Sequence, residues 1–194
     1  MSKTPTKFDS SQQFKAREIS STPGKDHQEI EKTVYSHVSN LHEQLCDWLK
    51  MKDKGIRIFK SVIALKLHEC LDDHYPGQLK PNMRFLLDIL ENLKTVLDSC
   101  EIINDQLKAL AKLRPDNEPA ISTWSVSEIS KNVIEILEAL KKEYELKEVI
   151  IENVAHCRDE QLIDVYITAW EHDVYLHIDS FSYLFAEVGL ASLP

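Results

Sequence analysis

Three long stretches without proline constrain the fold of this chain more than any other feature of its sequence. The 7 prolines among 194 residues leave residues 24–75, 82–114 and 120–193 free of proline. Because a proline costs about 3 kcal/mol inside a helix, these stretches are where long helices can form. Glycine, at only 4 residues, adds few further breaks. The chain is therefore expected to consist of a few unusually long helices.

The first stretch carries apolar residues every three or four positions between Ile30 and Cys70. This spacing places them on one stripe of a helix, which we expect over residues 26–72. The stripe breaks at Lys52 and Gly55, where we expect a weak point or kink. The helix would be roughly 70 Å long at about 1.5 Å per residue, too long to lie inside a compact globule of this size. The pattern therefore predicts a coiled coil.

A second helix is predicted from Pro81 to Leu113, after a turn at residues 72–77 that contains Pro76 and Gly77. Its apolar stripe alternates spacings of three and four over nearly four heptads, the strongest coiled-coil signal in the chain. The stripe consists of Leu86, Leu90, Leu93, Leu97, Cys100, Ile103, Leu107 and Leu110. Because the connection is short, we predict an antiparallel coiled-coil hairpin over residues 26–113.

The rest of the chain is predicted to hold a linker at residues 114–124 and a helical C-terminal region at 125–194. Ser125 and Glu128 have the spacing of a capping box, so a third helix should begin there and run to about residue 156. Shorter helices follow at about 159–171 and 180–188, the last capped by Asp179 or Ser180 and stopped by Gly189. No segment alternates with a period of two, so we expect no β-strand. The predicted class is all-α, with long antiparallel coiled-coil helices and a small C-terminal helical cap.

Residues 1–25 differ from the rest in charge and composition. They contain five Lys or Arg and two acidic residues, which gives this segment a net charge of +3 and the remainder −12. With few apolar residues they are predicted to form a disordered tail. Thr4 and Thr22 each begin a Thr-Pro-x-Lys sequence, the pattern that cyclin-dependent kinases phosphorylate. We predict phosphorylation at both threonines, which would reverse the basic character of the tail.

Composition and spacing argue against several classes of protein. The net charge of −9 disfavours direct nucleic-acid binding, and neither a signal peptide nor an apolar run of membrane-spanning length is present, so we expect a soluble intracellular protein. The four cysteines are interpreted as buried, reduced thiols. Glycine-rich phosphate loops and Glu-x-x-His pairs are absent, and the pairs His68–Asp72 and Glu152–His156 lack further metal ligands. We therefore predict no catalytic residue, metal or cofactor.

Two sets of apolar residues are candidates for binding a partner protein. A thin helical rod leaves part of its stripe uncovered, so a partner chain is expected to complete the bundle. The C-terminal aromatic residues allow two interpretations, a small core folded over the third helix or a docking surface. Lys50, Lys54 and Arg57 likewise form either a patch for an acidic partner or a solvated face. The candidate partner-binding residues are Leu90, Leu97, Leu107, Trp124, Tyr166, Trp170, Tyr175, Phe181 and Phe185.

The segment from Thr123 to Gly189 resembles the C-terminal region of the cyclin-dependent kinase 2-interacting protein family. The Thr-Pro-x-Lys sequences of the basic tail are also similar to that family, whereas residues 26–113 match it only in heptad character. The residues that carry the resemblance are Thr123-Trp124, Lys147, Ala155-His156, Asp159, Leu162, Tyr166, Trp170, Tyr175, Asp179-Ser180, Glu187 and Gly189.

The resemblance implies a non-catalytic adaptor in DNA replication, genome maintenance and ribosome maturation. The partners that it implies are a cyclin-dependent kinase, the origin-firing kinase, a checkpoint protein and AAA-type ATPases, in addition to another coiled-coil subunit. It also implies a location in the nucleus, with the cytoplasm as a second location. Two other classes stay open from the residues themselves: a structural coiled-coil tether of a cytoskeletal or vesicle complex, and a helical-bundle metalloenzyme.

Overall fold

The computed structural model describes residues 23–69, 77–114 and 118–193. Thr4, Thr22 and almost all of the predicted tail lie outside the described residues, as does Asp72 of the His68–Asp72 pair. The described part contains five helices and one small sheet, which confirms the all-α prediction. The helices are α1 (Pro23–Glu69), α2 (Leu79–Leu113), α3 (Val126–Val154), α4 (Glu160–His172) and α5 (Ile178–Glu187).

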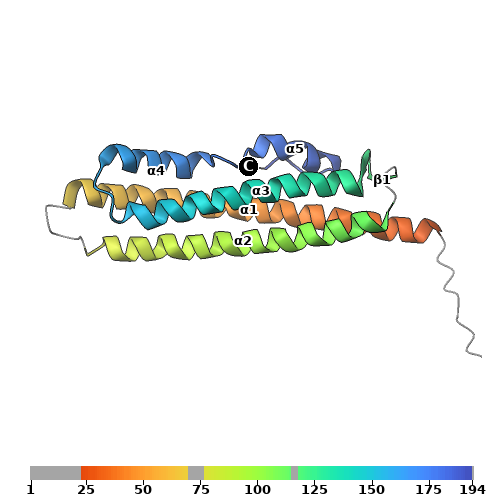
Figure 1. Ribbon diagram of the computed structural model, residues 1–194, viewed down its shortest axis with the longest axis horizontal. Coiled ribbons are helices and arrows are strands. Elements are labelled where there is room, and N and C mark those ends of the chain that lie inside the picture. Colours follow the sequence, from red (N-terminus) through yellow and green to blue (C-terminus); the bar gives the residue numbers. More distant parts are fainter. Residues whose placement is uncertain (1–22, 70–76, 115–117, 194) are drawn as a thin grey trace, which may run out of the picture.

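The helices form an elongated bundle (Figure 1). The three long helices α1, α2 and α3 lie side by side and alternate in direction, and α4 and α5 follow one another along the side opposite α2. The two short helices contact both α1 and α3. They therefore take the place of the fourth helix in an up-down-up-down bundle. Supercoiling of the long helices, which the coiled-coil pattern predicts, stays a prediction.

Helix α1 runs without interruption through 47 residues, including Lys52 and Gly55. The helix is not interrupted there, and a weak point or kink within it stays a prediction. The apolar stripe is broken at Gly55 for another reason, because the indole of Trp170 from α4 lies directly against the Gly55 backbone. The missing side chain makes room for a neighbouring helix.

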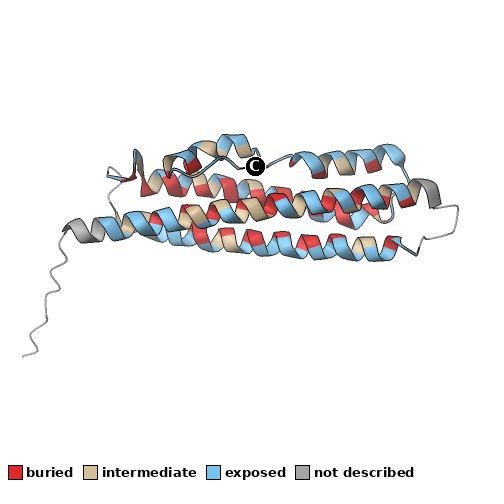
Figure 2. Ribbon diagram, turned by 180° about the vertical axis from the view of Figure 1, so that it is seen from behind, coloured by how far each residue is buried: buried red, intermediate tan, exposed pale blue. Residues whose placement is uncertain are grey.

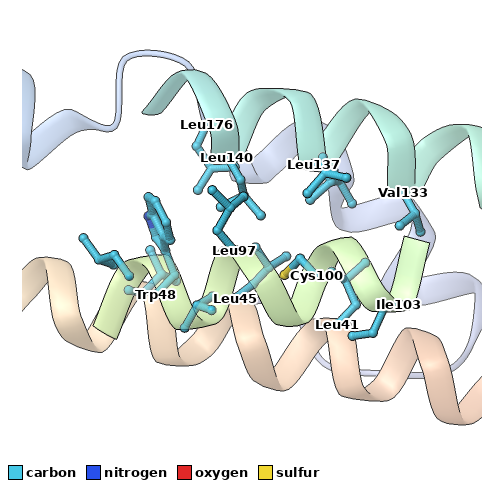
Figure 3. Close-up of a cluster of buried hydrophobic side chains, with 14 of the residues drawn as sticks. Leu41, Leu45, Trp48, Leu97, Cys100, Ile103, Val133, Leu137, Leu140 and Leu176 are labelled. Atoms are coloured by element: carbon cyan, nitrogen blue, oxygen red, sulfur yellow. The ribbon is translucent and has the colours of Figure 1, made fainter. Parts of the chain in front are cut away.

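The apolar stripes of the long helices meet in one continuous hydrophobic core (Figure 2). Figure 3 shows its middle part, where Leu45 and Trp48 of α1 lie beside Leu97 of α2 and Leu140 of α3. All four side chains are buried. The partner chain that we expected to complete the bundle is not needed to cover these stripes, because α3, α4 and α5 of the same chain cover them. The division into a hairpin and a C-terminal region stays a prediction, although the core runs through both.

The predicted linker contains a small sheet that the sequence analysis missed. Strands β1 (Pro119–Ile121) and β2 (Trp124–Ser125) pair in antiparallel fashion around a tight turn in which Ser122 has a φ of 43°. The expectation of no β-strand was therefore wrong. Strands of three and two residues are too short to show a period of two in the sequence.

The helix ends follow the predicted signals in two cases out of three. At α3, Ser125 Oγ accepts from the Glu128 N–H (3.2 Å) and Glu128 Oε2 accepts from the Ser125 N–H (2.7 Å), which confirms the capping box. Gly189, with a φ of 74°, ends α5, and the N–H of Leu190 donates to the Phe185 carbonyl, as in a Schellman motif. However, α5 begins at Ile178, earlier than the predicted caps, and its N-cap His177 makes no side-chain capping bond.

Candidate functional site: the anchored C-terminal helices

A group of buried charges fixes the junction between α4 and α5 to the bundle. The Lys147 Nζ lies 2.8 Å from Glu143 Oε1 and 2.8 Å from Asp173 Oδ1, and it donates to the Trp170 carbonyl at 3.2 Å. The side chains of Lys147 and Glu143 are 0% exposed and that of Asp173 is 3% exposed. Burying a charge is very costly unless it is paired, and the Lys147–Asp173 pair exists only while the end of α4 stays in place.

Asp173 connects the end of α4 to two long helices at once. It takes a left-handed conformation, with a φ of 46°, and ends α4. Its Oδ2 lies 2.9 Å from the Nζ of Lys52 in α1, while its Oδ1 faces Lys147 in α3. The next turn is fixed by the Tyr175 N–H, which donates to Glu143 Oε2 at 2.8 Å. The break between α4 and α5 is thus determined by buried polar contacts.

Trp170 is the apolar anchor of the same junction. Its side chain is fully buried, its Nε1 donates to the Lys52 carbonyl at 3.1 Å, and its ring centroid lies 4.8 Å from that of Phe59. The Lys147 Nζ lies 4.8 Å from the centroid of the indole, close enough for a cation–π interaction. A Cβ on Gly55 would lie only 2.6 Å from the indole Cζ2. Because residue 55 is a glycine, α4 can pack this closely against α1.

Glu187 ties the far end of α5 to the β1–β2 turn. Its Oε1 accepts hydrogen bonds from the Thr123 N–H, from Thr123 Oγ1 (2.9 Å) and from the Trp124 N–H (3.0 Å). Ser122 Oγ donates to the Glu187 carbonyl at 3.2 Å. The backbone N–H of Thr123 is the main cause that lowers the pKa of Glu187 below its ordinary value. The chain therefore attaches α5 to the end of the bundle where α3 begins.

Many of the residues that carry the family resemblance belong to these contacts. Thr123 and Trp124 bind Glu187, whereas Lys147 and Trp170 lie in the buried junction. Asp159, another of them, caps α4 by accepting from the Gln161 N–H at 2.9 Å. The resemblance thus rests largely on residues that hold α4 and α5 against the bundle. The sequence analysis missed the other members of these contacts, which are Lys52, Gly55, Glu143 and Asp173.

Most of the predicted partner-binding residues turn out to be covered by the chain itself. In this fold the buried ones hold the bundle together and offer no surface to a partner, which favours the core interpretation for the two C-terminal ones. The buried residues are Leu90, Leu97, Leu107, Trp170 and Phe185. Three others are half-buried, namely Trp124, Tyr166 and Phe181. Tyr175 is 46% exposed. Partner binding through these last four residues stays a prediction.

An apolar surface that the sequence analysis did not single out lies on the outer side of α4. Leu162 is 40% exposed and Val165 is 58% exposed, and the half-buried Ala169 follows on the same flank. The signal was present in the sequence, because 7 of the 13 residues of α4 are apolar, more than one buried stripe requires. What the sequence could not show is which part of this wide stripe points inward.

The structure also shows where the residues of the predicted basic face lie and whether a group of metal ligands forms. Lys50, Lys54 and Arg57 are all exposed, and Lys50 pairs with Asp47 at 2.8 Å. The neighbouring Lys52 instead turns inward to Asp173. Among the described residues no group of three or more His, Cys, Asp and Glu could hold a metal ion. Nor does any described helix have the length and apolar character to cross a membrane.

The fold and these contacts define a helical bundle protein in which two short helices, held by buried ion pairs and an indole, stand in for a fourth long helix. No protein-family model matches the chain. The chain is distantly similar to curated proteins named Cyclin-dependent kinase 2-interacting protein. The relative from Xenopus laevis is 21% identical over 74% of this chain and 80% of its own length. That from Mus musculus is 23% identical over 74% and 81%, and that from Homo sapiens is 21% identical over 76% and 82%.

Proposed function

We propose that this chain is a non-catalytic adaptor that binds a cyclin-dependent kinase. The observation that carries the proposal is the similarity over about three quarters of the chain to proteins whose name states that they interact with cyclin-dependent kinase 2. That name describes interacting proteins rather than enzymes. The similarity covers most of the relatives' length, so it concerns the whole bundle and not one helix.

The geometry supports a binding role for the bundle. Its core is closed by the chain's own helices, and α4 and α5 are fixed by Lys147, Asp173 and Glu187. A rigid surface loses little conformational entropy when it binds, which favours recognition by preformed faces. The exposed flank of α4 and the half-buried Phe181 and exposed Tyr183 of α5 are such faces. The chemistry of the described residues fits recognition better than catalysis.

The finer parts of the proposal follow from the family resemblance. We propose that the partners include the origin-firing kinase, a checkpoint protein and AAA-type ATPases, in the nucleus and in the cytoplasm. The proposed role is in DNA replication, genome maintenance and ribosome maturation. Thr4 and Thr22 are proposed as phosphorylation sites of the bound kinase, because each is followed by Pro-x-Lys.

The proposal is tested with purified proteins. The full-length chain is mixed with a purified cyclin-dependent kinase 2–cyclin complex and analysed by size-exclusion chromatography and by calorimetry. Co-elution and a saturable heat are expected, and phosphorylation with ATP should add phosphate that the Thr4→Ala/Thr22→Ala variant does not take up. Absence of both binding and phosphorylation would refute the proposal. Recovery of tubulin or vesicle proteins with the tagged chain from cells, without kinases or AAA-type ATPases, would favour the structural tether instead.

A further inference from the structure

We draw no further inference here: the strongest candidate, the apolar surface patch of Leu162, Val165 and Ala169 on the outer flank of α4, is an unpartnered face, and nothing in the part of the chain that the structure describes shows what covers it.

Discussion

The indole of Trp170 lies so close to Gly55 that a Cβ at position 55 would be 2.6 Å from its Cζ2 atom and 2.7 Å from its Nε1. Real Cβ atoms do not approach other atoms this closely, so one helix would have to move. The same indole donates to the carbonyl of Lys52, which keeps α4 from sliding along α1. The contact between a residue without a side chain and the largest side chain of α4 therefore sets the distance between the two helices.

The first prediction is that Gly55→Ala destabilises the protein. In an ordinary helix interior this change would stabilise it by roughly 0.5–1 kcal/mol, because alanine is the better helix former. Here the added methyl group meets the indole, and overpacking of this kind costs about 1–3 kcal/mol. Urea denaturation followed by circular dichroism should show a lower free energy of unfolding.

The control for this prediction replaces Trp170 by a smaller side chain, so that a methyl group at position 55 no longer clashes with the indole. In Trp170→Phe the smaller ring lacks the indole atoms nearest to Gly55, so adding Gly55→Ala to that variant should cost much less than in the wild type. The exposed Gly77, with no atom within 4 Å of its Cβ position, should tolerate Gly77→Ala. If Gly55→Ala were as well tolerated as Gly77→Ala, the close contact would be disproved.

The second prediction concerns the buried lysine. Lys147→Met would leave Glu143 without its ion-pair partner, and Asp173 with only Lys52, in a buried site. Breaking a buried pair by removing one partner costs about 3–5 kcal/mol. Because these contacts join α4 to the bundle, residues 160–188 should lose protection in hydrogen exchange before α2 does. Lys94→Met, at the exposed Lys94–Asp98 pair, is the control and should cost less than about 1 kcal/mol. Equal costs for the two variants would argue against an energetic role for the junction.

The long helices could be predicted from the sequence because their signals are repeated many times. The stripe of α2 and the capping box at Ser125 specify a helix and its position, and no other pattern in these segments favours a different structure. The placement of α4 could not be predicted in the same way, since it depends on contacts between residues far apart in the chain. Glu143 and Lys147 are spaced like a common surface pair on a helix, and only Asp173, brought from the end of α4, makes their burial possible.

The same reasoning explains why the candidate binding residues were partly misplaced. Trp170 and Val165 belong to one wide apolar stripe in the sequence, yet the first is buried and the second is 58% exposed. Periodicity identifies the stripe, whereas the position of α1 and α3 decides which edge is covered. Gly55 was interpreted as a helix weakness for a similar reason, because a glycine that admits a distant indole looks like any other glycine in the sequence.

The third prediction is that Glu187 makes the stability of the fold depend on pH in the acidic range. Its pKa is lowered in the folded protein, mainly by the Thr123 N–H, relative to an ordinary value of 4.5. A lowered carboxyl pKa stabilises the fold above pH 4.5, and this contribution is lost as the pH falls through the lower, folded value. Glu187→Gln should therefore lower the melting temperature at pH 7 by about 2–4 °C and flatten its decline between pH 5 and pH 3. Glu138→Gln, at an exposed glutamate, is the control, and an identical acid profile of the wild type and Glu187→Gln would contradict the prediction.

The fourth prediction uses the cysteines as probes of the core. Cys100 faces the centre of the bundle and is 1% exposed, and burial raises the pKa of its thiol to about 12. At pH 8 only about one molecule in ten thousand would then carry the reactive thiolate at this position. Cys157, in the connection between α3 and α4, is half-exposed. Iodoacetamide should therefore modify Cys157 in the native protein and Cys100 only after unfolding in urea, as measured by mass spectrometry of the peptides.

Lys147→Met, which loosens α4 but leaves α2 and α3 packed, should not expose Cys100. Rapid modification of Cys100 in the native wild type would mean that the three long helices open in solution, contrary to a core that the chain closes by itself.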